Sequence, residues 1–216
     1  MPALLILLGM VFFGSLLRAA AFSPRSYDWR YNVISSLASP RDNPDAWHIG
    51  QGGLIVTGLL LVGLNPLLYR RFADANRGPL LPASFLFLAG AILLALTGWI
   101  VPGPHIWGGR HLHEHLAQFS AVCLGLATIF YLLCLLKEKL FRPGQPARII
   151  AGTLVIVPLA VLLLSRLALV VVHVTASAAD YEAMKKSLWC SLALWEWIGA
   201  VCLYAFFWMI ALVHRE

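Results

Sequence analysis

The sequence predicts an all-α, polytopic membrane protein: one bundle of six transmembrane helices with both termini in the cytoplasm. Of its 216 residues, 60% are hydrophobic and only 12% are charged. An average soluble domain is about 45–50% apolar and roughly 25% charged. Apolar stretches of about 20 residues, long enough to cross a hydrocarbon core of about 30 Å, recur along the chain. Connectors such as "NRGP" and "RPGQP" separate them and are typical of turns.

The predicted spans share an almost uninterrupted apolar composition, and together they make residues 1–216 a single transmembrane domain. They are roughly residues 2–22, 48–69, 79–101, 112–136, 147–173 and 188–213. The first span lacks a positively charged segment before its apolar run, and more spans follow it. We therefore expect a retained helix rather than a cleaved signal peptide.

Basic residues are concentrated in two loops that six spans would place on the same side of the membrane. These residues are Arg70, Arg71, Arg77, Lys137, Lys139, Arg142 and Arg148. The positive-inside rule puts both loops in the cytoplasm, which predicts a multi-pass protein of the plasma (inner) membrane. The net charge of +6 then reflects loops that meet anionic lipid. We expect membrane lipid as the partner, and neither nucleic acid nor a soluble protein.

The cysteines indicate packing rather than cross-linking. Cys123, Cys134, Cys190 and Cys202 lie in or beside apolar runs and show no CxxC spacing. Neither a disulfide framework nor a zinc knuckle is therefore predicted.

Ionisable residues within the spans gather toward the outer side. At a rise of about 1.5 Å per residue, Arg166 and Glu196 lie roughly 10 and 12 Å inward from the outer ends of the fifth and sixth spans. Because a charge inside a membrane is costly, we expect an ion pair between them. Arg18, His48 and Gln51 lie near the same side. The inner halves of the spans are nearly bare of polar residues, so the pattern predicts one polar pocket that opens to the outer leaflet.

The first outer loop, residues 23–47, is long enough to cover such a pocket. Within it, "YNVISSLA" could form a short helix in the interface and carries Ser35 and Ser36. Asp45 is placed to cap the N-terminus of the second span.

Histidines at the start of the fourth span are the main chemical signal. His111 and His115 are four residues apart and share a helix face, a spacing that suits two ligands of one metal ion. His48 could supply a third ligand, and Asp45 or Glu196 could activate a bound water. A proton relay, contact with lipid headgroups and a single haem are the alternatives.

The candidate residues divide by role. Candidate catalytic residues are His115, Glu196, His48 and Asp45; candidate substrate-binding residues are Arg18, Arg166, Ser35, Ser36 and Gln51; candidate metal ligands are His111, His115 and His48. The metal expected there is a divalent ion such as zinc.

Three landmarks follow one another along the chain. After the first span, "YNVISSLASPRDNPDAWHIGQGGLIVTGLLL" runs from a serine step that includes Ser36 to His48 and into the second span. His115 opens the fourth span and is followed ten residues later by Gly125. Glu196 lies in "LWEWIGA", early in the sixth span.

On these landmarks the chain resembles the membrane proteins grouped as domain of unknown function 998, and it is distantly similar to the Frag1/DRAM group. The resemblance implies a compact six-helix bundle over most of the chain, and it implies no particular activity. Ser36 stands where the family has an aspartate, and Trp197 where it has an arginine. The layout is also similar to that of multi-helix membrane hydrolases that bind zinc, an analogy of arrangement only.

Two hypotheses for function follow. One is an intramembrane enzyme, a hydrolase or transferase, that acts on a lipid or lipid-linked substrate with a histidine or metal-bound water as base. The other is a non-catalytic lipid-binding or regulatory membrane protein whose basic residues hold a headgroup. A transporter or channel subunit is disfavoured, because a path would need polar residues across the whole bilayer.

Overall fold

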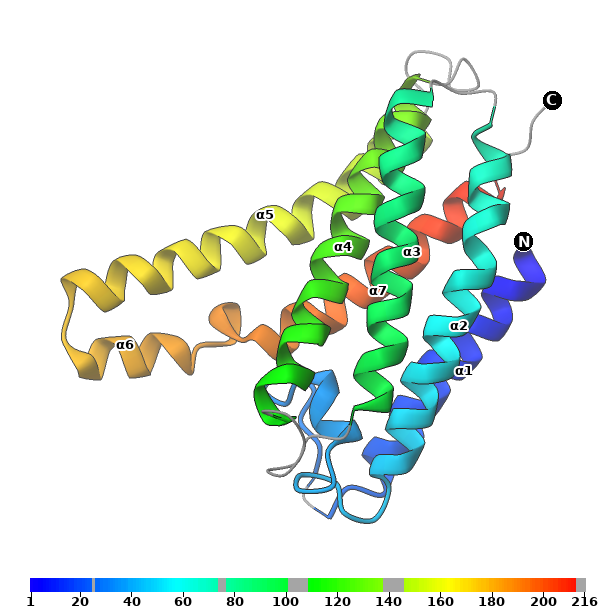
Figure 1. Cartoon of the computed structure of the whole chain (residues 1–216). Helices are drawn as coiled ribbons and strands as arrows, with labels where there is room; N and C mark the ends of the chain where they lie inside the picture. The colour runs from blue at the N-terminus through cyan, green and yellow to red at the C-terminus, as the bar shows by residue number, and fades with distance from the viewer. Residues whose placement is uncertain (25, 74–76, 101–108, 138–145, 213–216) are drawn as a thin grey trace.

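The computed structural model describes residues 1–24, 26–73, 77–100, 109–137 and 146–212 (Figure 1). Within these ranges all regular secondary structure is helical. Its elements are α1 (Pro2–Ala21), η1 (Ile34–Ala38), α2 (Trp47–Arg71), α3 (Arg77–Trp99), α4 (Gly109–Lys137), α5 (Pro146–Thr175), α6 (Ala178–Lys185), η2 (Leu188–Cys190) and α7 (Leu192–Leu212). Six of the helices are long and apolar enough to cross a membrane, as the sequence predicts: α1, α2, α3, α4, α5 and α7.

The helix α6 was not expected, because the segment between the last two spans reads as a polar loop. A reciprocal cap explains it. The Ser177 hydroxyl donates to Asp180 Oδ2 over 2.7 Å, and the main-chain N–H of Asp180 donates back to Ser177 Oγ over 3.2 Å. This arrangement satisfies N–H groups that a helix start leaves unpaired. "SAAD" is therefore a helix-start signal that the sequence reading missed.

Helix α3 lies between α2 and α4, and the three pack closely along their length (Figure 1). A glycine makes the α2–α3 approach possible. A Cβ added at Gly58 would lie 2.7 Å from both the Ala91 carbonyl oxygen and the Ala95 nitrogen. Small residues at a helix contact let two backbones approach, which is a common packing device in membrane proteins.

The largest core cluster joins the ends of α2, α3, α4 and α7 that lie toward the basic loops. Tyr131 is its centre, with its ring stacked on Phe72 at 5.7 Å between centroids and edge-to-face with Phe87 at 6.0 Å. Phe207 extends the cluster to α7 through an edge-to-face contact with Phe87 at 5.3 Å. Such aromatic pairs stabilise by more than the apolar area they bury.

Helices α5 and α6 run away from the other helices and form the arm of the molecule seen in Figure 1. Near its start, α5 buries Ala151 and Val155 in the core cluster. Further along, many of its large side chains are exposed and apolar: Ile156, Val157, Leu159, Leu164, Leu167, Val170, Val171 and Val174. An apolar exposed surface of this kind suits a helix surrounded by lipid.

Candidate functional site

The loop between α1 and α2, which is predicted to face outward and is called the outer loop below, is hydrogen-bonded at several points to α7 and to the residue before it. The main-chain N–H of Ile34, at the start of η1, donates to Glu196 Oε2 over 2.9 Å. The Ser191 hydroxyl donates to the carbonyl oxygen of Arg30. The Trp197 indole N–H donates to the Tyr27 hydroxyl oxygen over 3.0 Å. The loop is thus a docked cover over this end of the bundle.

Tyr27 makes two hydrogen bonds at this contact. Its hydroxyl also donates to the carbonyl oxygen of Asn32 over 2.6 Å, so the group is both donor and acceptor. Burial raises the pKa of Tyr27 from 10.0 to about 12; the bond from Trp197 opposes the rise, and the nearby Glu196 charge adds to it. The phenol is therefore neutral at physiological pH.

Asn43 fastens the other side of the same loop. Its side-chain amide donates to the carbonyl oxygen of Ala19 over 3.0 Å and to that of Leu37 over 3.3 Å. Leu37 is buried against Leu16 and Ala19 of α1. The short helix predicted within "YNVISSLA" is confirmed as η1, and these contacts place it against α1 and α2.

The predicted cap of α2 is wrong. Ala46 occupies the N-cap position and no side chain caps the helix, while Asp45 is exposed. The carbonyl oxygen of Asn43 accepts the Trp47 N–H over 2.9 Å and the Ala46 N–H over 3.3 Å. A main-chain turn therefore satisfies the donors that Asp45 was expected to take.

The two serines of η1 are half-buried. The Ser36 hydroxyl donates to the carbonyl oxygen of Val33 over 2.7 Å, a local bond that stabilises the start of the short helix. The Ser36 hydroxyl proton is therefore used in a local hydrogen bond. The substrate-binding role predicted for Ser35 and Ser36 stays a prediction.

The structure gives the histidines an unexpected arrangement. His48 and His115 are exposed, and the His111 side chain lies outside the described residues. Among the histidines whose side chains the structure describes, the buried one is His113, which is 2% exposed. Two residues of α-helix turn a side chain by about 200°, so His113 lies on the face opposite to the one that His111 and His115 share.

The metal site therefore stays a prediction. Within the part of the chain that the structure describes, no group of three or more His, Cys, Asp or Glu residues is placed to hold a metal ion. His48 is exposed next to Trp47, with 6.1 Å between their ring centroids. His115 is exposed on α4.

The predicted ion pair cannot be described, because the Arg166 side chain lies outside the described residues. Its proposed partner Glu196 accepts the loop N–H given above, which sequence reasoning did not foresee. Arg18 is exposed, and its guanidinium lies 5.3 Å from the ring centroid of Phe22. Gln51 is buried in α2.

A polar cluster in the opposite half of the bundle was also missed. Asn65 Oδ1 accepts a bond from the Ser84 hydroxyl over 3.1 Å and a longer one from the Tyr131 hydroxyl over 3.4 Å. It joins α2, α3 and α4 through side chains that are buried or half-buried. The expectation that the inner halves are nearly bare of polar residues did not include this cluster. The signal was present in the sequence as Asn65 within an apolar run.

The loop also carries an exposed ion pair. Arg30 Nη2 lies 2.8 Å from Asp28 Oδ2, and Arg30 Nε donates to Oδ1 over 2.9 Å. These side-chain bonds, followed by the bond from the Arg30 main-chain N–H, lower the pKa of Asp28. A pair this exposed contributes little to stability.

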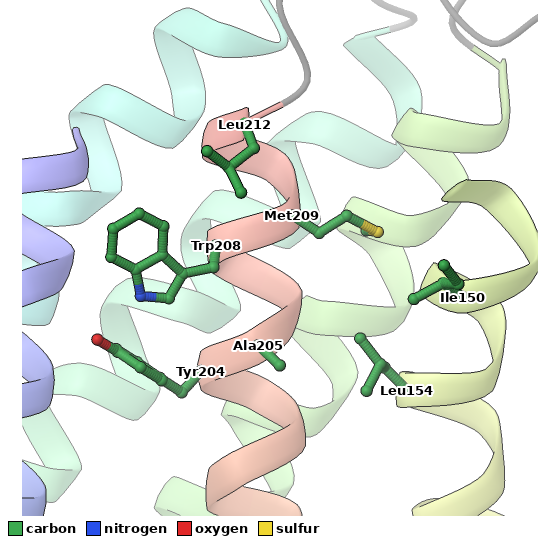
Figure 2. A pocket seen from close by; sticks show the side chains of 7 residues that line it. All are labelled: Ile150, Leu154, Tyr204, Ala205, Trp208, Met209 and Leu212. Atoms are coloured by element: carbon green, nitrogen blue, oxygen red, sulfur yellow. The ribbon is translucent and has the colours of Figure 1, made fainter. Parts of the chain in front are cut away.

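Two hollows accompany this geometry. One, of about 420 Å³, is formed by consecutive loop residues, Ser26 to Arg30, and is partly polar. The other, of about 610 Å³, is an apolar cleft between α5 and α7 (Figure 2). It is lined by Ile150, Leu154, Tyr204, Ala205, Trp208, Met209 and Leu212. We call the second hollow the α5–α7 cleft.

Comparison with known proteins returned no matching family model, no matching curated protein and no matching solved structure. The resemblance to domain of unknown function 998 stays a prediction.

Proposed function

We propose that this chain is a multi-pass membrane protein that binds a membrane lipid without chemically changing it, with one acyl chain of the lipid in the α5–α7 cleft. The cleft is the observation that carries this proposal. It is a shallow, largely open groove of about 610 Å³, a shape that suits an acyl chain lying along the protein better than an enclosed small molecule.

The chemistry of the lining favours hydrocarbon. The α5 side contributes Ile150 and Leu154, and the α7 side contributes mainly aromatic and aliphatic groups. The one hydroxyl in the lining, on Tyr204, donates to the carbonyl oxygen of Leu5 over 3.0 Å. Because that polar group is already paired within the protein, the cleft offers an occupant mainly apolar contact.

The position of the cleft favours lipid over a soluble apolar molecule. Both α5 and α7 are long and apolar enough to cross a membrane. In a bilayer, the hydrocarbon that surrounds such helices is acyl chain, and it is present in great excess over any other apolar ligand. A gap between two spanning helices is therefore filled by lipid unless protein fills it.

The basic loops support an anionic headgroup. Arg70 is exposed at the end of α2, and the neighbouring Leu68 and Phe72 belong to the same core cluster as Ile210 of α7. The cleft therefore opens at the end of the bundle that carries the basic residues. With the orientation predicted from the positive-inside rule, this is the cytoplasmic leaflet, where anionic lipids are attracted to lysine and arginine.

The test fills the cleft. Ala205→Phe adds a ring inside it, whereas Val122→Phe adds a ring to the exposed surface of α4, away from the cleft. Protein is purified in mild detergent, and bound phospholipid is counted by native mass spectrometry. We expect bound lipid in the wild type and in Val122→Phe, and a loss of at least several-fold in Ala205→Phe. Equal lipid in all three proteins, or none in the wild type, would refute the proposal.

The enzyme hypothesis has less support. Three of its four candidate catalytic residues, His48, Asp45 and His115, are exposed, and the fourth, Glu196, binds the outer loop. Its own test is metal content. Stoichiometric zinc in the wild type that is lost in both His111→Ala and His115→Ala would favour a metalloenzyme over a lipid binder.

A further inference from the structure

His113 is held in one orientation and has an unused nitrogen. Its Nδ1 lies 2.9 Å from the carbonyl oxygen of Ile100. A carbonyl only accepts, so Nδ1 carries the proton and donates. In the neutral ring Nε2 is then a bare acceptor. It is buried and has no hydrogen-bond partner among the described residues.

Gln51 presents the complementary group. Its side chain is 8% exposed, and its amide nitrogen, a donor, is buried with no partner in the described part of the chain. The residue lies where α2 meets α3, because a Cβ added at Gly98 would lie 2.8 Å from the Gln51 carbonyl oxygen. Gly98 is two residues from Ile100, which binds His113. Gln51 and His113 thus flank the same end of α3.

The helix register places the two residues on the faces of α2 and α4 that meet further along the bundle. Asn65 of α2 and Tyr131 of α4 already meet across α3, at 3.4 Å. Gln51 comes 14 residues before Asn65, which is nearly four turns and a rise of about 21 Å. His113 comes 18 residues before Tyr131, which is five turns and a rise of about 27 Å. Each residue therefore shares the face of its partner in that contact, and the two lie within about 6 Å in height.

We propose that His113 and Gln51 form a buried binding site for a hydroxyl group. The hydroxyl donates its proton to His113 Nε2, and its oxygen accepts a bond from the Gln51 amide N–H. An ammonium group offers no acceptor to the amide, and a carboxylate offers no donor to Nε2. A bridging group that is both donor and acceptor satisfies both nitrogens, which have no partner among the described residues.

Two sources supply such a hydroxyl: a bound water, or the hydroxyl of a lipid with a glycerol or polyol headgroup. Buried waters are usually found where protein polar groups lack partners. Either source would give the site the same hydrogen bonds, so the experiment has to separate them.

The experiment reads the nitrogens of His113 directly. Protein labelled with 15N-histidine is placed in lipid nanodiscs, and His113→Asn assigns the signal by its loss. We expect one protonated nitrogen and one acceptor nitrogen whose resonance is displaced from the value of a free acceptor. Gln51→Leu should return it to that value. Gln118→Leu, a matched change at an exposed position of α4, should leave it unchanged.

Polarisation transfer to Nε2 identifies the source. Transfer from water protons that persists after lipid exchange indicates a bound water. Transfer from lipid protons, with a displacement lost on exchange into a lipid without hydroxyls, indicates a headgroup; both outcomes support the site. An undisplaced acceptor in the wild type, two protonated nitrogens, or a displacement that survives Gln51→Leu would overturn it. A displacement that Gln51→Leu removes, without transfer from either source, would indicate a direct Gln51–His113 bond and would also overturn it. The wild-type spectrum decides on its own if Gln51→Leu fails to fold.

Discussion

The main-chain N–H of Ile34 donates to the carboxylate of Glu196 over 2.9 Å and joins two parts of the chain that are 162 residues apart. A carboxylate within a span is expected to do chemistry or to pair with a base. Here it receives the first N–H of a short helix, which a helix start leaves unpaired. Glu196 therefore holds the outer loop against α7 by accepting this hydrogen bond.

Removing the Glu196 carboxylate should weaken the packing of the outer loop against α7. Hydrogen bonds to charged groups contribute about 1.5–3 kcal/mol, so Glu196→Ala should release residues 26–46 without unfolding the bundle. Limited trypsin digestion in nanodiscs checks this at two exposed sites, Arg30 and Arg41. We expect cleavage several-fold faster than in the wild type. Glu196→Gln, which keeps an acceptor oxygen, should fall between. Asp45→Ala is the control, since it removes an exposed loop charge that is not adjacent to either cleavage site. If it accelerates digestion as much as Glu196→Ala, the loss of the bond is not the cause.

Stability at high pH should report on Tyr27. Its pKa is raised from 10.0 to about 12, so the folded protein holds the phenolic proton more tightly than the unfolded chain. This contribution is complete below about pH 10 and is lost as pH rises toward about 12. We expect the thermal midpoint of the wild type to fall more steeply across this window than that of Tyr27→Phe. The exposed Tyr31 provides the matched control, Tyr31→Phe, which should keep the wild-type slope. Parallel curves for Tyr27→Phe and the wild type would contradict the assignment.

The α2–α3 contact should tolerate no side chain at Gly58. A Cβ there would lie 2.7 Å from backbone atoms of Ala91 and Ala95, and backbone in a packed helix cannot move aside. Gly58→Ala should lower the free energy of unfolding by about 1–3 kcal/mol, a typical penalty for overpacking. Gly63 has no atom within 4 Å of an added Cβ, so Gly63→Ala should be neutral or slightly stabilising. Denaturation in mixed detergent measures both, and equal effects would argue against the described α2–α3 packing.

The polar cluster of Asn65 should stabilise the bundle through two donors. Asn65→Leu removes the acceptor and leaves the Ser84 and Tyr131 hydroxyls to find other partners. Interhelical hydrogen bonds in membranes average about 0.6 kcal/mol and reach about 1.7 kcal/mol. We expect a larger loss from Asn65→Leu than from Tyr131→Phe, whose bond is longer. A double-mutant cycle measures the coupling, and a coupling of zero would show that the Tyr131 contact contributes nothing.

The positions of the six long helices along the chain were predictable because each is marked by a long apolar run. Uninterrupted apolar runs define six helices within a few residues of those observed. The turn predicted at "NRGP" is wrong for its last three residues, which begin α3, and "RPGQP" lies almost entirely outside the described residues. The short helix η1 was also foreseen. The arm of α5 and α6 was not, because nothing in the apolar run of α5 tells which part of it packs on protein and which part faces outward.

The candidate site was less predictable, because hydropathy does not fix the rotation of a helix. When nearly every residue is apolar, no amphipathic pattern identifies the inner face. The spacing of His111 and His115 predicts a pair of ligands, yet His115 is exposed and His113, between them, is buried. His113 lies seven residues, or about two helical turns, before Ser120, so the two share a face of α4. Ser120 donates to the Gly90 carbonyl oxygen over 2.8 Å. The spacing of His113 and Ser120 can be seen in the sequence, but only the packing of α4 against α3 shows that their shared face is buried.

The contacts between the outer loop and α7 can form only late in synthesis, because α7 is the last of the described helices to be made. The loop is synthesised directly after α1, while Ser191, Glu196 and Trp197 emerge from the ribosome only after α5 and α6. Until then the η1 segment has no partner on α7. During biogenesis the loop can therefore pack against α1 and α2 first, and it gains its bonds to α7 only after α7 has been synthesised.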